Sequence, residues 1–418
     1  MRILIYGLNY APELTGIGKY TGEMAVWLTE RGHDVHVVTA PPYYPAWRIR
    51  DDYRGPWYRT ERIAGQPVVY RTPLYVPERP TGLKRIAHLF SFMVGSIPVM
   101  LRQAFWQPEV VFTIEPTFFG VPLTLFVAKC ANAACWLHVQ DFEVDAAFEL
   151  GLLPGQGPVH DAALRIEKFF TFAFDRVSGI SPRMVDRARA KGIPAESTVL
   201  FPNWVDVEQI HPIQSSPDRS NTFRQLLAGK VKDIDNTVVL LYSGNMGAKQ
   251  GLELLAPLAE QFEKNDRVHF LFCGDGAFRK RLEQLVAHRC NVTLLPLQPL
   301  SKLNELLNAA DIHLLPQRAS AADLVMPSRL SAMLSSGRPV VATALPGTQV
   351  AQVVAGRGLV VAPEDARSLC VAVETLIEDK PLRLSLGRAA REYAIRHLGK
   401  QQVLEQFEQD LKAAREHV

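Results

Sequence analysis

The chain has 418 residues, which is too long for one ordinary hydrophobic core and predicts two or three domains. Its net charge of +3 is small and no stretch interleaves basic with aromatic residues, so we expect no nucleic-acid partner. The five cysteines are odd in number and form no C-x-x-C pair. This argues against a disulfide framework or a zinc site and favours reduced thiols in a cytoplasmic protein.

Short apolar segments alternate with helix-length segments from end to end, which is typical of α/β architecture with parallel sheets. Strands are predicted at residues 2–9, 34–40, 68–74, 110–116, 134–141 and 176–181, then at 237–244, 268–274, 292–298, 311–317, 339–343 and 358–362. Prolines, serines and asparagines in residues 196–221 indicate a linker between the two series. The sequence therefore predicts two doubly wound, Rossmann-like domains joined near residue 205 and facing each other across a cleft, with a helical tail from about residue 381.

The stretch ELTGIGKY, residues 13–20, lies where the first predicted strand passes into the first helix. A helix N-terminus at the carboxyl end of a strand suits an anion. Gly16, Gly18 and Gly22 read G-x-G-x-x-x-G, however, and come too late after the strand for the dinucleotide fingerprint. Because the second strand also ends without an acid that could hold a ribose, we expect no NAD site.

One apolar segment fits a membrane surface. The longest uncharged stretch, residues 86–101, is shorter than the roughly 20 residues that span a bilayer and contains Pro98. Basic and aromatic residues lie in or beside it, so residues 79–106 fit a helix in the membrane interface. A buried core helix fits the same pattern, and both interpretations stay open. The N-terminus lacks the features of a signal peptide, so export is not expected.

The second domain repeats the strand, glycine turn and helix start twice. In YSGNMGAKQG, Gly244 and Asn245 form the turn and Lys249 projects from it, which together with a helix dipole would suit a phosphate. Taken alone, this motif fits a solvated turn lysine better. In FCGDG the turn is formed by Gly274, Asp275 and Gly276, with Asp275 a candidate donor contact or a helix cap. A further helix begins at Pro327, Ser328 and Arg329, and this arginine could bind a diphosphate or lie on the surface.

Polar side chains gather at the carboxyl end of the strand in CWLHVQDFEVD. His138 and Gln140 share one face, and Asp141 lies opposite. Such a cluster could position an acceptor hydroxyl, take its proton or stabilise positive charge on a sugar ring. The alternative for His138 is a hydrogen-bonded core histidine. Glu143 and Asp145 fit acids at a helix N-terminus.

The order of these motifs resembles glycosyltransferase family 4 with the GT-B fold, over essentially the whole chain. The resemblance rests on GIGKYTGEMAVWLTERGHDVHVVT, SPRMV, FPNWVD, YSGNMGAKQGLE, CGDG, ADIHLLPQ, MPSRL and SSGRPVVAT. PELTGIGKYTGEM, TAPPYYP and LHVQDFEVD are similar to enzymes of colanic-acid-type exopolysaccharide assembly, which add a sugar, proposed to come from GDP-fucose, to a lipid-linked oligosaccharide. The resemblance implies an acceptor domain at residues 1–204, completed by about 395–418, and a donor domain at residues 205–394.

The family's donor residues carry over unevenly. Lys249 matches the diphosphate-binding lysine, but Asn245 stands where an arginine is usual. The family's glutamate pair is lost: its second position is Ala332, and its first falls near Leu324, beside Asp323 as a possible substitute. The family's adjacent histidine–aspartate pair is also altered here, because Gln140 precedes Asp141 and the histidine stands two positions earlier than Gln140.

The resemblance implies a retaining transfer that needs no metal or other cofactor. Its expected catalytic residues are His138, Asp141 and Lys249. The donor would contact Gly16, Gly18, Gly244, Asn245, Lys249, Gly274, Asp275, Gly276, Asp323, Pro327, Ser328 and Arg329, and the acceptor would contact Glu13, Lys19, Tyr20 and Gln140. The one D-x-D, Asp233 to Asp235, fits a solvated turn rather than a metal site.

A lipid-linked acceptor places the enzyme at the cytoplasmic face of the inner membrane, which favours residues 79–106 as a membrane-facing patch. Two other functions fit the same fold: a sugar-nucleotide epimerase, and a non-catalytic partner subunit that has lost the glutamate pair. The epimerase would need carboxylates in the cleft of the second domain, where this sequence has few, and the absence of any donor hydrolysis would indicate the non-catalytic subunit.

Overall fold

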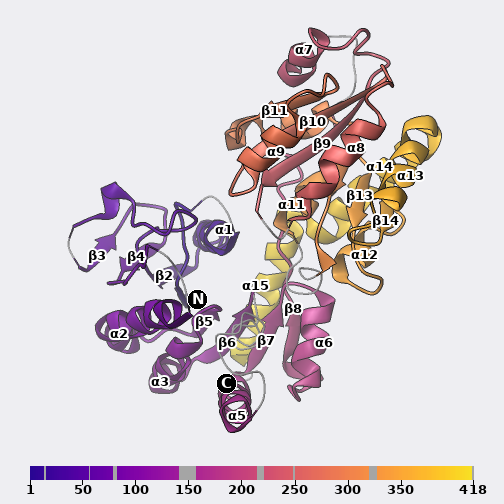
Figure 1. Cartoon of the computed structure of the whole chain (residues 1–418). Helices are drawn as coiled ribbons and strands as arrows, with labels where there is room; N and C mark the ends of the chain where they lie inside the picture. Colours follow the sequence, from indigo (N-terminus) through magenta and orange to yellow (C-terminus); the bar gives the residue numbers. More distant parts are fainter. Residues whose placement is uncertain are drawn as a thin grey trace. The chain divides into compact units, whose positions relative to one another are not determined.

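The computed structural model describes residues 1–13, 16–55, 57–78, 82–140, 157–213, 221–247, 250–319 and 327–416, with the side chains of 118 and 158–163 left aside. The described chain forms two compact units (Figure 1). Unit 1 contains residues 1–202 together with 403–418, and unit 2 contains residues 203–402. Each unit is built around its own sheet.

The sheet of unit 1 has the strand order β3-β4-β2-β1-β5-β6-β7-β8. All its pairs are parallel except β3 with β4. Its strands are β1 Arg2–Gly7, β2 Asp34–Thr39, β3 Arg59–Glu61, β4 Val68–Arg71, β5 Val110–Ile114, β6 Ala134–Val139, β7 Arg176–Gly179 and β8 Thr198–Leu200. Its main helices are α1 Gly16–Glu30, α2 Gly82–Trp106, α3 Val121–Ala131, α5 Pro158–Thr171 and α6 Pro182–Ala190. Strand order reverses between β1 and β5, which makes the ends of these two strands the crevice of the unit.

The sheet of unit 2 is parallel throughout, in the order β11-β10-β9-β12-β13-β14. Its strands are β9 Val238–Asn245, β10 Val268–Asp275, β11 Val292–Leu295, β12 Ile312–Leu315, β13 Val340–Thr343 and β14 Gly358–Val361. Its helices are α7 Thr222–Ala228, α8 Leu255–Gln261, α9 Arg279–Val286, α10 Leu303–Ala309, α11 Ser328–Ser335, α12 Gln349–Val354, α13 Ala366–Glu378 and α14 Lys380–Leu398. The order reverses between β9 and β12, so a ligand is expected beyond the carboxyl ends of these strands.

The short apolar strands form because both faces of each sheet are covered, which lets nearly every strand side chain be aliphatic or aromatic. Strands β1, β5 and β9 are buried almost along their whole length. The prediction of two doubly wound α/β domains is therefore confirmed. Two details were missed: β3, and β8, which lies inside the segment predicted as a linker. Strand β8 is three residues long and only partly buried, which leaves little pattern to detect.

The helical tail is two helices rather than one. Helix α14 ends at Leu398, and α15 runs over Lys400–Glu416. The break occurs where Val205 forms a bridge with Gly399 and its N–H donates to the carbonyl of Leu398, 2.8 Å away. Helix α15 packs into unit 1, where Phe407 stacks on Phe201 with ring centroids 4.1 Å apart.

Candidate active site

Two glycine turns of unit 2 lie against each other at the ends of β9 and β10. A Cβ on Gly274 would collide with the carbonyl oxygen of Gly244. A Cβ on Gly276 would lie 2.7 Å from the amide oxygen of Asn245. The N–H of Met246 donates to the carbonyl of Asp275 at 2.7 Å, which locks the turns together. These glycines are therefore needed for close backbone contact, and they leave a compact, backbone-rich surface at the strand ends.

Arg329, near the start of α11, lies over the first of these turns. Its guanidinium stacks on the ring of Tyr242 at 5.0 Å and its Nη1 donates to the Tyr242 hydroxyl at 2.8 Å. The same hydroxyl donates to the carbonyl of Asn245. A Cβ on Gly244 would meet Nη1 of Arg329 at 3.5 Å, which measures how closely the guanidinium covers the turn. The structure thus places a cation beside Asn245, the position where the family usually has an arginine.

Three polar residues at this crevice were not predicted from the sequence: Tyr242, Gln250 and Gln317. Tyr242 orients Arg329 through its hydroxyl. Gln317 follows β12, and its backbone is held by Thr343 through two bonds of 2.7 Å. Its side-chain oxygen, the side-chain oxygen of Gln250 and Nε of Arg329 are buried and have no partner among the described residues. The signal that could have found Gln317 is its position after the strand at which the sheet order reverses.

The remaining predicted donor residues of unit 2 divide into two groups. Asp275 is exposed at the end of β10, and its carboxylate accepts from the N–H of Gly276 at 2.8 Å. It does not cap α9, because Phe278 occupies the N-cap position of that helix, so the helix-cap alternative was wrong. Pro327 and Ser328 stand at the N-cap and first position of α11. Lys249 and Asp323 lie outside the described residues.

The opening stretch of unit 1 is organised around a buried carboxylate. Oε1 of Glu13 accepts from the backbone N–H groups of Tyr43 and Tyr44, at 3.1 and 3.0 Å. Its Oε2 accepts from the side chain of Asn9 at 3.0 Å. A Cβ on Gly18 would lie 2.6 Å from this oxygen, so the glycine makes room for the carboxylate. Glu13 therefore positions the loop after β2, and with both carboxylate oxygens engaged it has little capacity left to bind an acceptor. Burial raises the pKa of Glu13.

The other residues of this stretch have separate tasks. Gly16 begins α1 with a φ of +62°, which favours glycine. Lys19 is half-exposed and lies 3.7 Å from Glu23. Tyr20 is buried in unit 1, so little of its ring could touch a ligand. Lys19 thus keeps a side chain available for an acceptor.

His138 is enclosed at the end of β6. Its Nδ1 lies 2.8 Å from the Ser178 hydroxyl, and its Nε2 lies 2.9 Å from the side-chain nitrogen of Gln140. The rings of Phe112 and Phe201 flank it, with centroids 5.7 and 4.9 Å away. Burial lowers the pKa of His138 to about 3. A neutral imidazole with both nitrogens engaged favours the core-histidine alternative over a general base.

Two acidic motifs were predicted in addition to the residues above, one after β6 and one before β9. Asp141, Glu143 and Asp145 lie outside the described residues. The carboxylate of Asp233 accepts from the backbone N–H groups of Asp235 and Asn236, at 3.1 and 3.3 Å, and its other oxygen accepts from the Asn236 amide. The D-x-D is therefore an exposed turn closed on itself, as its polar surroundings indicated.

Comparison with known families assigns both halves of the chain. Residues 15–204 match the model of a glycosyl transferase 4-like domain, and residues 237–379 match that of glycosyl transferases group 1. Over 99% of its length the chain is 39% identical to the whole of the protein named "Putative colanic acid biosynthesis glycosyl transferase WcaI" from Escherichia coli K12. The chain belongs to glycosyltransferase family 4. It is a glycosyltransferase.

Solved structures confirm the GT-B fold of this glycosyltransferase. Sucrose-phosphate synthase from Thermosynechococcus elongatus matches with a TM-score of 0.75 at 18% identity, covering both chains completely. Anabaena Alr3699/HepE, solved in complex with UDP-glucose, matches with a TM-score of 0.66 at 18% identity, over 99% of this chain and all of that one. At these identities the likeness shows the fold alone.

Proposed function

We propose that the enzyme transfers a sugar, with retention at the anomeric carbon, from a nucleotide-sugar to a polyprenyl-diphosphate-linked saccharide in colanic-acid-type exopolysaccharide biosynthesis. The observation that carries the donor half is the guanidinium of Arg329 above the Gly244 turn, at the crevice of unit 2. The relation to the E. coli protein supports the pathway. GDP-fucose is the donor we would test first.

The chemistry asked of unit 2 is electrostatic. The leaving diphosphate gains negative charge as the glycosidic bond breaks, and a fixed cation with backbone donors stabilises it. Arg329 is held by Tyr242 through Nη1, and its Nε has no hydrogen-bond partner among the described residues, so we assign this guanidinium to the phosphates. The diphosphate itself helps to deprotonate the acceptor hydroxyl, so we propose no metal and no other cofactor. Lys249 would supply the second cation.

Thermal stabilisation by a panel of nucleotides and sugar nucleotides tests the donor site. A ligand at one hundred times its Kd stabilises the folded protein by about 2.7 kcal/mol. We expect one sugar nucleotide to raise the melting temperature, Arg329→Gln to reduce that rise and Lys249→Ala to lose it. Transfer of its labelled sugar to a lipid-linked saccharide then tests the reaction. A donor that is bound and converted without acceptor would point to the epimerase, and the absence of any binding would point to a non-catalytic subunit.

We also propose that α2 lies on the cytoplasmic face of the inner membrane, through residues 79–106. By length and composition α2 is the one described helix that could cross a membrane. Its buried side chains, however, hydrogen-bond to unit 1: Ser96 to the Tyr6 hydroxyl at 2.8 Å and Gln103 to His36 at 2.7 Å. A helix docked in this way on a sheet lies along a membrane rather than through it.

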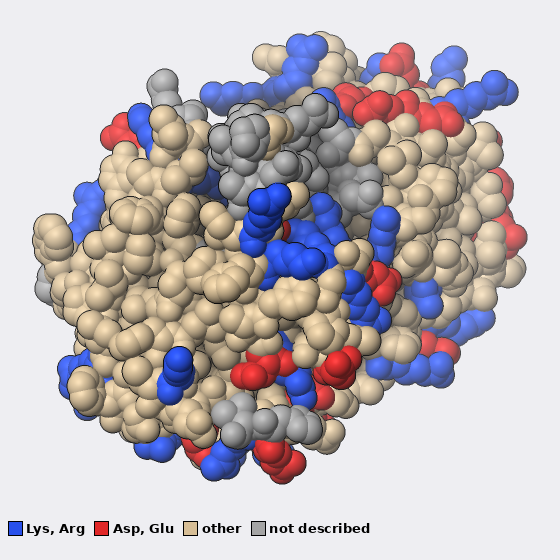
Figure 2. Space-filling view, turned by 90° about the horizontal axis from the view of Figure 1, so that it is seen from below, with Lys and Arg blue, Asp and Glu red and all other residues tan. Residues whose placement is uncertain are grey.

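The opposite face of α2 is apolar and exposed. Its members are Leu83, Phe90, Val94, Leu101 and Phe105, at spacings of seven and four residues that place them in one stripe. Leu83 and Phe105 are 83% and 89% exposed. A contiguous exposed apolar stripe of this kind is typical of an interaction or membrane-contact site. Viewed from below, the part of the surface over α2 and α3 is broadly tan with few charges (Figure 2). Lys84 and Arg102 flank the stripe and suit anionic lipid headgroups.

A further inference from the structure

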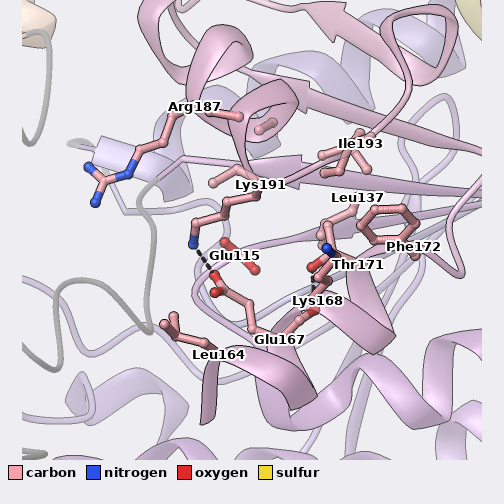
Figure 3. A pocket seen from close by; sticks show the side chains of 14 residues that line it. Glu115, Leu137, Leu164, Glu167, Lys168, Thr171, Phe172, Arg187, Lys191 and Ile193 are labelled. Carbon is pink, nitrogen blue, oxygen red and sulfur yellow. Dashed lines mark hydrogen bonds and ion pairs between the residues drawn. The ribbon is translucent and has the colours of Figure 1, made fainter. Parts of the chain in front are cut away.

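A cavity of about 350 Å³ lies within unit 1, between α5, α6 and the sheet (Figure 3). This volume is at the lower end of the range of small-molecule sites, roughly 300–1,000 Å³. Its lining is mainly apolar and includes Leu137, Val139 and Val177 from the sheet, Leu164 from α5, and Ala188 and Ala190 from α6. Neither the family comparisons nor the donor chemistry of unit 2 assigns it a ligand.

Helix α5 covers this cavity without filling it. Among its described side chains, residues 164–171, the buried one is the carboxylate of Glu167. Ile166 and Phe169 are instead 50% and 72% exposed, although an amphipathic helix normally turns its apolar side toward the sheet. Phe172 lines the cavity and is 45% exposed, so the apolar lining continues to the surface beside these two residues. The cavity beneath α5 is thus accessible to an apolar ligand.

The charged lining limits how that guest could lie. Nζ of Lys191 is 2.7 Å from Oε1 of Glu167, and the buried Glu115 lies next to this pair (Figure 3). Two carboxylates inside would repel a phosphate placed among them. Lys168 and Arg187 add two positive charges to the lining, and Figure 3 shows Arg187 directed away from the Glu167–Lys191 pair. An amphiphile would therefore put its hydrocarbon inside and its anionic group at the rim.

We propose that this cavity binds the isoprene units next to the phosphates of the lipid acceptor, with the diphosphate held at the rim by Lys168, whose exposed ammonium lies over the Phe172 ring. The proposal rests on the lipid-linked acceptor proposed above. It assigns to α5 the task of separating the acceptor's hydrocarbon from water, while the exposed Ile166 and Phe169 contact the surface from which the lipid comes.

Farnesyl diphosphate, a soluble probe with three isoprene units, tests the site by calorimetry on the full chain. We expect it to bind at least tenfold more tightly than inorganic diphosphate, farnesol or dodecanoate. Ala188→Phe fills the cavity and should lower its affinity at least tenfold, and Ala190→Leu does so with less risk to folding. Ala287→Phe, at an exposed position of unit 2, is the control and should change nothing.

Equal binding of inorganic diphosphate, or undiminished binding of farnesyl diphosphate by the filled variants, would overturn the proposal. Equal binding of dodecanoate would make the cavity an acyl-chain site and overturn the isoprenoid assignment. Thermal stabilisation by the sugar nucleotide is measured on the same variants and should persist. Loss of farnesyl diphosphate binding with intact donor binding supports the cavity, whereas absent donor binding in the unmodified protein counts against the proposed function and leaves this result standing.

Discussion

At the scale of single residues, the donor crevice depends on a pair 87 residues apart in sequence, Tyr242 and Arg329. Arg329→Gln should weaken sugar-nucleotide binding by roughly 10- to 100-fold, because a hydrogen bond to a charged group contributes about 1.5–3 kcal/mol. Tyr242→Phe keeps the ring but removes the hydroxyl that orients the guanidinium, and we expect a loss of about tenfold or less. Calorimetric titration measures both. If Arg329→Gln binds the sugar nucleotide with undiminished affinity, the phosphates bind elsewhere.

His138 carries a prediction about stability and pH. Its folded pKa is about 3, below the ordinary 6.5, so the unfolded chain binds the proton more readily. Its contribution to stability is therefore complete above about pH 6.5 and declines as the pH falls toward 3. Between about pH 6.5 and pH 3 the unfolding free energy should decrease less steeply with falling pH in His138→Gln than in the unmodified protein, by up to about 1.4 kcal/mol per pH unit. Urea titrations at several pH values check this, with the exposed His288→Gln as control. An unchanged slope would mean that His138 binds its proton as readily in the folded protein as in the unfolded chain.

At the scale of elements, α2 presents two opposite stripes, one hydrogen-bonded to the sheet and one exposed and apolar. Leu83→Glu or Phe105→Glu should reduce binding to anionic phospholipid vesicles several-fold, because each places a charge where hydrocarbon would be buried. Val371→Glu, at a 56% exposed position of unit 2, is the matched control. Sedimentation with vesicles measures the effect, and raised salt should weaken the remaining binding. Equal sedimentation of all three variants would place the membrane contact on another surface.

In the whole molecule, residues 403–418 pack into unit 1 together with residues 1–202, and Glu408 anchors α15 there. This buried carboxylate lies 3.1 Å from His33, 3.2 Å from Arg31 and 2.7 Å from Lys412. Despite burial, hydrogen bonds from Lys412 and His33 lower its pKa to about 2. Its stabilising effect is therefore complete above about pH 4.5 and lost as the pH falls toward 2.

Glu408→Gln should release α15 at neutral pH, at a cost of about 1–3 kcal/mol, because charged hydrogen bonds are lost and His33 stays buried. Hydrogen exchange of the α15 amides is the measurement, and we expect faster exchange there and little change in unit 2. Glu392→Gln removes an exposed pair with Arg396 and should cost less than about 1 kcal/mol. Unaltered protection of α15 in Glu408→Gln would show that Phe407 and its apolar neighbours hold the helix by themselves.

The features that could be predicted from the sequence alone are the local ones. Strand–helix alternation, the glycine turns at the strand ends and the family motifs are all contained in short windows, because the backbone conformation and the side-chain period act over a few residues. They were sufficient to predict two Rossmann-like domains and a family 4 glycosyltransferase. Tertiary structure decided what depends on neighbours distant in sequence: that Ser178 and Phe201 enclose His138, that Tyr242 holds Arg329, and that Glu13 is occupied by the loop after β2. Burial and hydrogen-bond partners are set by packing between elements, which no short window contains.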